Sequence, residues 1–170
     1  MRSIKIRLED IARQNWLSEI NNNNRKDPNQ GNKLRTYIRF KSELLFENYL
    51  TSITNIEDRR ALTKLRISDH CLQIEKGRHE IPKKKPEERI CPKCDTEVED
   101  EKHFLVKCKF YETQRLKLAN EINDKTKINF TQLTDQDKFQ LLVNPRTNIQ
   151  KLVGKFTNEC FKMRKGQMNE

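Results

Sequence analysis

Four residues in one short window have the types and spacing of a metal site: Cys91, Cys94, His103 and Cys108. Three thiols and one imidazole separated as C-x2-C-x8-H-x4-C can close a tetrahedral zinc site. Scattered reduced thiols are a weaker explanation, because three of the five cysteines and one of the three histidines fall in this window. We therefore expect one structural Zn²⁺, since a catalytic zinc keeps one position open for water.

Turn and helix signals around these residues indicate how the chain would aim them at one metal. Pro92 presets one φ angle of the turn between the first two cysteines, and residues 95 and 96 offer a second turn. The acidic run over residues 97–101 suits the first turn of a helix that would carry His103 and Cys108. Five residues along an α-helix leave two side chains about 140° apart. Both ligands reach one metal only if Cys108 sits where the helix ends or is distorted.

The composition is that of a lean, basic chain. Only 34% of the 170 residues are hydrophobic and 35% are charged, so a metal staple would compensate for a small core. No apolar run approaches the length of a membrane span, and the N-terminus has no signal-peptide core. We expect an intracellular protein, in the nucleus, the cytoplasm or both, where reducing conditions favour metal-bound cysteines over disulfides.

The net charge of +10 favours a polyanionic partner, RNA or DNA. Candidate phosphate contacts lie in a proline-bracketed, extended and solvated linker over residues 80–90 and on the polar side of a C-terminal helix. For the linker, a solubilising loop is at least as good an explanation of these charges, and for the helix a solvated face is the commoner explanation. The candidate residues are Lys83, Lys84, Lys85, Lys151, Lys155, Lys162, Arg164 and Lys165.

Hydrophobic periodicity and capping signals predict a mostly α fold, with helices around a small zinc-pinned knuckle or hairpin. We divide the chain into an N-terminal helical segment (1–54), a helical and zinc-binding core (55–122, with the knuckle at 91–108) and a C-terminal helical segment (123–170). The expected helices lie near 4–20, in the second half of 33–51, over 55–67 behind a capping box at Thr54, at 69–76, over 110–122, from Thr134 to Asn144 and along an apolar stripe at 149–163.

Two further residues have ligand chemistry but lie outside the knuckle. Cys160 falls on the apolar stripe of the last helix, so we interpret it as a buried core thiol. His70 is followed by Cys71 and His79, but their spacing suggests no second complete metal site. We therefore expect His70 to be a packing or hydrogen-bonding residue.

The rest of the sequence lacks the patterns of familiar catalytic sites. With only four glycines it offers no Gly-rich phosphate loop, and no Ser/His/Asp or Cys/His arrangement stands out. Asp135 and Asp137 come closest to the carboxylate pair of a nuclease, but they look like first-turn residues of a helix. We therefore expect no enzymatic activity, neither polymerase nor nuclease.

Several stretches of the sequence resemble one known family. They are residues 65–70 (LRISDH), 74–78 (IEKGR), 89–94 (RICPKC) and 98–105 (VEDEKHFL), followed by Cys108 and Tyr111. This pattern is similar to the zinc-binding region that follows the reverse transcriptase in non-LTR (LINE-type) retrotransposon proteins. The resemblance is densest over residues 65–111, and the flanking segments extend it over most of the chain.

The resemblance implies a zinc module that helps a retroelement protein to hold RNA or target DNA. By match to the motif, Cys91, Cys94, His103 and Cys108 would be the ligands, although Lys109 stands where a proline is expected. A reverse transcriptase or another retroelement protein would be the partner. The polymerase motifs themselves are missing here, which fits a fragment, a degenerate copy or a reused host gene.

A zinc-stabilised protein–protein interaction module, without direct nucleic-acid binding, is the alternative function. Closed zinc sites often fix a surface for a partner. Residues 91–115 hold five basic and six acidic side chains, so the zinc segment itself is not basic. The charge of that segment favours the alternative, whereas the charge of the whole chain favours nucleic acid.

Overall fold

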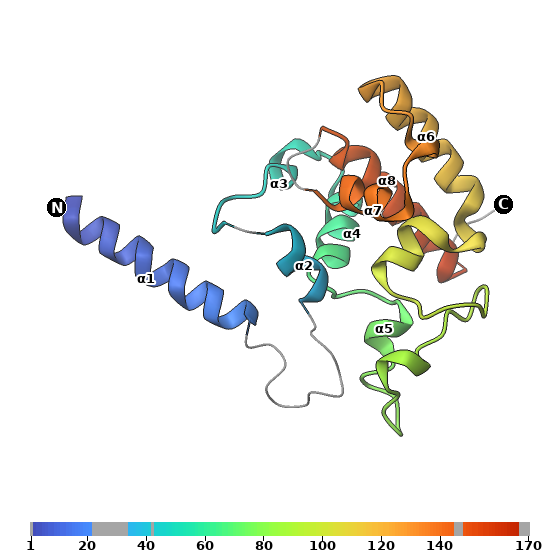
Figure 1. The fold of residues 1–170 in the computed structure, drawn as a ribbon, viewed down its shortest axis with the longest axis horizontal. Helices are drawn as coiled ribbons and strands as arrows, with labels where there is room; N and C mark the ends of the chain where they lie inside the picture. Colours follow the sequence, from blue (N-terminus) through green and yellow to red (C-terminus); the bar gives the residue numbers. More distant parts are fainter. Residues whose placement is uncertain (1, 22–33, 42, 145–147, 167–170) are drawn as a thin grey trace.

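The computed structural model describes residues 2–21, 34–41, 43–144 and 148–166. The described residues are mostly helical, which confirms the expected fold class, and their β-structure is limited to one isolated antiparallel bridge between Ile90 and Val98. In chain order the helical segments are α1 (Arg2–Asn21), α2 (Arg35–Phe40), α3 (Tyr49–Ser52), α4 (Ile56–Arg66), α5 (Gln73–Lys76), η2 (Pro86–Glu88), η3 (His103–Lys107), η4 (Lys109–Tyr111), α6 (Glu112–Thr126), η5 (Phe130–Gln132), α7 (Asp135–Val143) and α8 (Gln150–Arg164), as Figure 1 shows.

Helices α4 and α8 pack most closely in the body of the molecule, and α6 and α7 also pack against α8. One cluster of buried hydrophobic residues runs from Tyr49 to Phe161, so it takes residues from all three segments proposed from the sequence. Gly154 lets α8 approach α4, because an added Cβ would lie 3.0 Å from the carbonyl oxygen of Asp58. The stripe predicted on α8 is buried as expected, at Ile149, Leu152, Val153, Phe156 and Cys160.

Side-chain caps set the starts of two helices. Helix α4 begins behind Asn55, whose Oδ1 accepts hydrogen bonds from the backbone N–H groups of Glu57 (2.9 Å) and Asp58 (3.1 Å). The capping residue is therefore Asn55, one position after the predicted Thr54. Helix α7 begins behind Thr134, and Asn144 is its C-terminal cap, as predicted.

The prediction for residues 33–51 is wrong in its second half. Helix α2 occupies the part that was ambiguous in the sequence, whereas residues 43–48 form a loop that ends in the single turn α3. Ion pairs explain the loop: Lys41 Nζ lies 2.6 Å from one carboxylate oxygen of Glu47, and Arg66 lies 3.1 Å from the other. The ammonium of Lys41 also donates to the carbonyl of Leu45, a contact that holds the chain in a turn.

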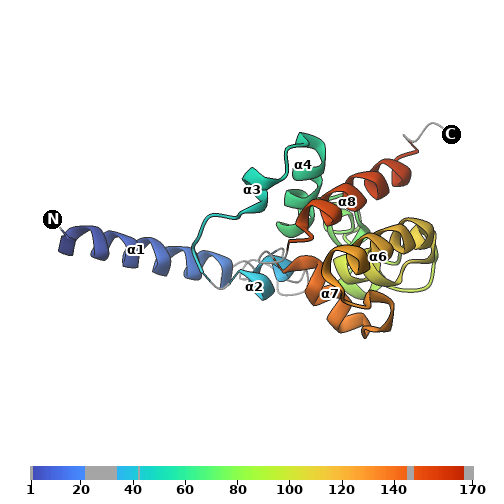
Figure 2. The same ribbon diagram turned by 90° about the horizontal axis from the view of Figure 1, so that it is seen from above.

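Helix α1 extends away from the body in both views (Figures 1 and 2). Its C-terminal end is anchored, because Ile20 is buried and Trp16 packs edge-on against Tyr37 with ring centroids 6.4 Å apart. Its side chains from residue 4 to residue 15 are exposed. None of the helices in the described part of the chain combines the length and the hydrophobicity needed to cross a membrane.

Candidate metal centre

The four predicted ligands converge on one point. The sulfur atoms of Cys91, Cys94 and Cys108 and a ring nitrogen of His103 all lie within 4.8 Å of one another. The Cys91 and Cys108 sulfurs are 3.8 Å apart, and the Cys94 sulfur lies 3.3 Å from Nε2 of His103. These four residues are therefore close enough to hold a metal ion.

A short hairpin presents the first two ligands. The backbone N–H of Cys91 donates to the carbonyl of Glu97 at 2.9 Å, and that of Glu99 donates to the carbonyl of Arg89 at 2.9 Å. At the tip, Asp95 has a φ of 53°, and its N–H donates to the Cys91 carbonyl at 2.8 Å. Aspartate tolerates this left-handed conformation better than most residues, so the tip forms at modest cost. The tight turn that was expected between the cysteines is therefore part of a hairpin.

A π-helical turn, η3, brings the last two ligands together. The N–H of Cys108 donates to the carbonyl of His103 at 2.8 Å, five residues back, and Cys108 then leaves the helix at φ −58° and ψ 119°. The expectation that the helix must end or distort at Cys108 is confirmed. In place of the predicted helix start at residue 97, the helix begins after Asp100, whose Oδ1 accepts from the His103 N–H at 2.7 Å.

Arg115 of α6 satisfies carbonyl groups that this distorted turn leaves free. Its Nε donates to the carbonyl of Leu105 at 2.9 Å, and one Nη donates to the carbonyl of Cys108 at 2.8 Å. A helix end that is buried in this way needs such partners for its last carbonyls. The guanidinium therefore fixes the position at which Cys108 leaves the helix.

The environment of the ligands sets their charge states. Burial raises the pKa of the thiols of Cys91 and Cys108, and it lowers the pKa of the His103 imidazole. Burial also acts to raise the pKa of Cys94, but hydrogen bonds from Thr96 and the other cysteines outweigh it and lower that pKa. The imidazole is thus held in the neutral form that binds metals, and a cation would favour the thiolates.

Three carboxylates flank the ligands at alternate positions, and we call Glu97, Glu99 and Glu101 the acidic ladder. Glu97 accepts a hydrogen bond from Lys107 Nζ at 2.8 Å, and one of its oxygens lies 3.8 Å from Nδ1 of His103. That nitrogen faces away from the Cys94 sulfur, so the carboxylate stands behind the ring in the position that often orients a metal-binding histidine.

Glu99 links the hairpin to α5 and α8. Both Nη atoms of Arg164 donate to its carboxylate, and the backbone N–H of Gln73 donates to it at 2.7 Å. The sulfur of Cys91 lies 3.5 Å from the same carboxylate. Arg164, a candidate phosphate contact, is therefore engaged in a buried ion pair that supports the knuckle.

Glu101 links the knuckle to α2 and to the segment after α4. It accepts from Ser68 Oγ at 3.0 Å, pairs with Nε2 of His70 at 2.8 Å and binds the guanidinium of Arg35. Burial acts to raise the pKa of Glu101, but the hydrogen bond to His70 and the charge of Arg35 lower it to about 2. The interpretation of His70 as a hydrogen-bonding residue is confirmed.

The linker at 80–90 is solvated only in part. Arg89 is almost completely buried, and its guanidinium donates to the carbonyls of Ile74 (2.7 Å) and Lys84 (2.8 Å). Gly77 makes room for it, because a Cβ there would lie 2.7 Å from Cγ of Arg89. Arg89 ties the linker to the knuckle two residues before Cys91, which corrects the expectation of a fully solvated stretch.

The other candidate phosphate contacts lie at the surface. Lys84 pairs with Glu80 at 2.8 Å, and Lys155 lies 3.8 Å from Glu121, so two of them have acidic neighbours. The exposed candidates are Lys83, Lys84 and Lys85 on the linker and Lys151, Lys155, Lys162 and Lys165 on one side of α8.

An exposed aromatic residue beside the knuckle was missed in the sequence. The side chain of Phe110 is 37% exposed, and Nζ of Lys93 lies 4.9 Å from the centroid of its ring. Lys109 is exposed beside it. We call Lys93, Lys109 and Phe110 the knuckle rim. A lysine and an aromatic residue directly after the last ligand, Lys109 and Phe110, were the available signal, but the sequence alone did not show that the ring is at the surface.

Asp135 and Asp137 lie in the first turn of α7, as expected. The backbone N–H of Asp137 donates to Thr134 Oγ1 at 3.1 Å, and the Thr134 hydroxyl donates to Oδ2 of Asp137 at 2.7 Å. These contacts account for Asp137 as part of a helix cap.

Comparison with family models, with curated proteins and with solved structures finds no match to this chain.

Proposed function

We propose that this chain is a zinc-binding module that binds RNA or DNA without catalysis. The observation that carries the proposal is the convergence of three sulfurs and one imidazole nitrogen within 4.8 Å. Thiolate and imidazole ligands favour zinc among the metals of the cell. In a regular tetrahedron with Zn–S bonds of about 2.3 Å, two sulfurs lie about 3.8 Å apart. The distance between the Cys91 and Cys108 sulfurs is 3.8 Å.

A structural role suits this ligand set better than a catalytic one. Four protein ligands fill a tetrahedral zinc, whereas a catalytic zinc keeps one position for water. Cys91 and Cys108 are completely buried, and Phe104 between the ligands packs on the rings of Tyr111 and Phe161. The metal would therefore join the hairpin and the π turn to the hydrophobic core.

The zinc proposal predicts one equivalent of zinc per chain, measured by elemental analysis of the purified protein. Cys94→Ser should abolish stoichiometric zinc and lower the melting temperature, because the remaining three ligands no longer close the tetrahedron. Cys71→Ser is the matched control, since Cys71 is also partly exposed but lies outside the cluster, and it should retain the metal. A wild-type protein without bound metal, or a Cys94→Ser variant of unchanged stability, would contradict the proposal.

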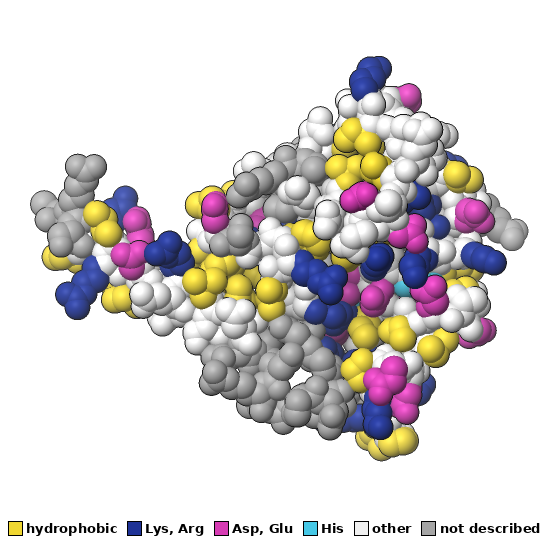
Figure 3. All heavy atoms as spheres, viewed as in Figure 1, with side chains coloured by type: hydrophobic (Ala, Val, Ile, Leu, Met, Phe, Trp, Pro, Cys, Tyr) yellow, Lys and Arg dark blue, Asp and Glu magenta, His cyan; other side chains and the backbone are white. Residues whose placement is uncertain are grey.

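Two features support nucleic acid as the ligand. The knuckle rim places an exposed ring beside two lysines, an arrangement that suits base stacking with phosphate contacts. Burial of Glu99 and Glu101 removes two of the six acidic side chains of residues 91–115 from the surface. Acidic and basic groups are mixed over the body in Figure 3, so local clusters such as the rim and the lysines of α8 would make the contacts.

A retroelement origin is part of the proposal. The motif resemblance over residues 65–111 supports it. Arg89, Glu99 and Glu101 lie within that motif, and each makes hydrogen bonds that support the knuckle. A reverse transcriptase or another retroelement protein would then be a partner. Such a module would hold RNA or target DNA near the enzyme rather than act on it.

Fluorescence anisotropy with single- and double-stranded RNA and DNA tests nucleic-acid binding. Counterion release predicts an affinity that falls steeply between about 50 and 200 mM salt. Phe110→Ala should weaken binding of single strands by about tenfold, because a stacked base contributes roughly 1–3 kcal/mol. Binding that is absent, or that stays constant over this salt range, would refute the proposal.

A matched control and a charge variant test the contribution of the knuckle rim. Leu116→Ala is the control for Phe110→Ala, because Leu116 is an exposed apolar residue on α6. Lys93→Gln should reduce the slope of log affinity against log salt concentration by about 1, the change expected when one phosphate contact is lost. If a protein partner is retained after nuclease treatment while all nucleic-acid probes fail to bind, the interaction-module alternative replaces this proposal.

A further inference from the structure

Exposed hydrophobic side chains are concentrated on α1 and on the loop after α2. Of the fifteen large hydrophobic residues that are exposed in the described part of the chain, eight lie in these two segments. Patches of this kind mark interaction sites, whereas single exposed hydrophobic residues are ordinary. The eight are Ile4, Ile6, Leu8, Ile11, Leu17, Leu44, Leu45 and Phe46. Ile4, Leu8 and Ile11 share one side of α1, and we call these three together with the three loop residues the α1 patch.

The loop part of the α1 patch is held in place by buried charges. Lys41 and Glu47 stand at its two ends and pair at 2.6 Å, and Arg66 of α4 pairs with Glu47 at 3.1 Å. The side chains of Lys41 and Arg66 are 8% and 5% exposed. The exposed residues 44–46 therefore sit on a fixed support and do not fold back into the core.

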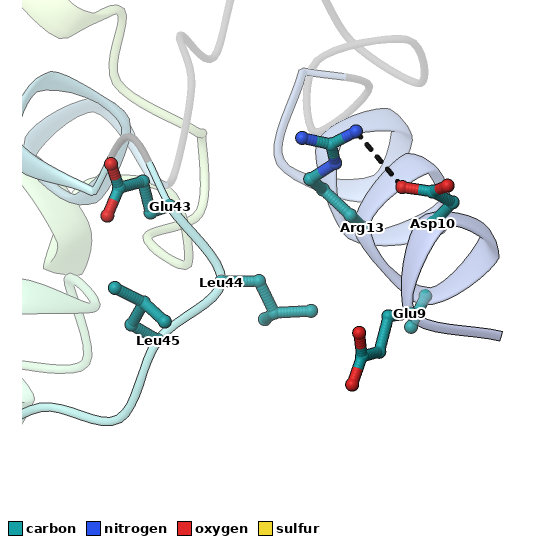
Figure 4. A pocket seen from close by; sticks show the side chains of 7 residues that line it. Glu9, Asp10, Arg13, Glu43, Leu44 and Leu45 are labelled. Atoms are coloured by element: carbon teal, nitrogen blue, oxygen red, sulfur yellow. Dashed lines mark hydrogen bonds and ion pairs between the residues drawn. The ribbon is translucent and has the colours of Figure 1, made fainter. Parts of the chain in front are cut away.

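A groove lies between this loop and α1. It has a volume of about 640 Å³ and is lined by Glu9, Asp10, Ala12, Arg13, Glu43, Leu44 and Leu45. Figure 4 shows Leu44 reaching from the loop toward α1, with the Asp10–Arg13 ion pair on the opposite wall. In Figure 3 hydrophobic side chains gather where α1 meets the body. The groove is lined by three apolar side chains, three carboxylates and one guanidinium.

The N-terminal half of α1 lacks the packing that usually stabilises a helix. Most helical stability in proteins comes from packing of an apolar face, and the anchoring contacts of α1 lie at Trp16 and Ile20. Ile4, Leu8 and Ala12 form an open apolar surface on the same helix. A partner that covers this half would supply the missing burial.

We propose that the α1 patch is a dimer interface, in which the N-terminal half of one α1 lies antiparallel in the groove of a second copy. Charge complementarity selects this occupant. The first turns of α1 carry Lys5 and Arg7 beside Ile4 and Leu8, while the groove carries Glu9, Asp10 and Glu43 against one cation, Arg13. Lys5 and Glu9 of one chain lie 3.9 Å apart as an exposed pair, a weak contact that leaves both available to a partner.

A two-fold axis makes this arrangement self-complementary. Each copy offers the basic first turns of α1, residues 4–8, and an acidic groove whose α1 wall is residues 9–13 of the same helix. Both contacts form at once in an antiparallel pair, so the assembly closes as a dimer. The inference rests on α1 and the loop after α2 and is independent of nucleic-acid binding or of the metal.

Sedimentation velocity of the nuclease-treated full chain tests the dimer. The expected mass is twice the chain mass of 20.4 kDa, with dissociation on dilution. Leu8→Glu and Leu45→Glu should each give a monomer, because each places a carboxylate in the apolar contact. Leu116→Glu is the matched control on α6 and should remain dimeric, since Leu116 is similarly exposed outside the patch.

A charge exchange tests the antiparallel geometry. The pair Lys5→Glu with Arg7→Glu should be monomeric, as should the pair Glu9→Lys with Asp10→Lys, because like charges then face each other. An equimolar mixture of these two variants should restore the dimer mass, since opposite charges meet again in both contacts.

Three results would overturn the proposal. These are a wild-type chain that stays monomeric at every concentration, a Leu8→Glu or Leu45→Glu variant that remains dimeric, and a mixture of the two charge variants that fails to associate. A monomeric wild-type chain that binds anionic vesicles or another protein through Leu8 would assign the patch to that occupant instead.

Discussion

Arg89 shows how one buried side chain shapes the surroundings of the knuckle. Its guanidinium reaches the carbonyls of Ile74 and Lys84, and its own carbonyl accepts from the N–H of Glu99. The planar group with several donors can serve both carbonyls at once. One residue thereby joins α5, the linker and the hairpin that carries Cys91.

Replacing Arg89 with lysine should lower the free energy of unfolding by about 1.5–3 kcal/mol, because a single ammonium cannot satisfy both carbonyls in this buried position. Urea unfolding monitored by circular dichroism measures the change. Arg60→Lys is the control on exposed surface, where Arg60 pairs with Glu57 at 2.9 Å, and should change stability by less than about 0.5 kcal/mol. A loss for Arg89→Lys as small as that of the control would show that the carbonyl contacts are not stabilising.

The spacing of the residues predicted the four candidate ligands, because a shared metal restricts both the residue types that can bind it and their separation along the chain. The spacing gave no information on Glu99, Arg164 or Arg89, since a charged side chain looks the same in sequence whether it is buried or exposed. Arg164 is the clearest case, because its position among the lysines of α8 suggested a phosphate contact. Only the packing of α8 against the hairpin shows that it faces Glu99.

At the level of elements, the π turn reconciles sequence spacing with geometry. His103 and Cys108 are five residues apart, which an ordinary α-helix would direct to different sides. The hydrogen bond from Cys108 back to His103 adds one residue to the turn, and Arg115 binds the carbonyls left at its end. The need for a distortion followed from the spacing, whereas its π-helical form and the role of Arg115 did not.

The cap of α4 gives a test at the scale of one element. Asn55→Ala should lower the free energy of unfolding by about 1 kcal/mol, because the N–H groups of Glu57 and Asp58 lose their acceptor. Thr54→Ala is the control and should have little effect, since the observed cap is Asn55. Thermal unfolding of both variants compares the two residues directly, and an equal loss for the two would mean that the cap is shared.

Helix prediction succeeded where local signals and tertiary packing agree. The apolar stripe of α8 and the cap of α7 both lie where the sequence indicated. It failed at residues 43–48, because Lys41 and Glu47 form ion pairs that include Arg66, a residue distant in sequence. The hydrophobic periodicity of residues 33–51 gives no information on the ion pair between Glu47 and Arg66.

At the level of the whole molecule, the core is continuous. Buried residues of the knuckle, including Cys91, Phe104 and Cys108, belong to the same cluster as the buried faces of α4, α6 and α8. The sequence indicated a small core in need of a staple, and two of the four candidate ligands, Cys91 and Cys108, lie inside that core. The packing of segments far apart in the chain could not be predicted from the sequence, because it depends on which helix faces contact each other in the folded protein.

The edge-on contact of Trp16 with Tyr37 has a practical consequence. Trp16 is the only tryptophan in the chain, and it sits at the junction of α1 and α2. Its near-ultraviolet emission therefore reports on the junction that carries α1, while the knuckle contributes no indole signal of its own. One sample thus holds an optical probe for the orientation of α1 that is spectrally separate from events at the ligand cluster.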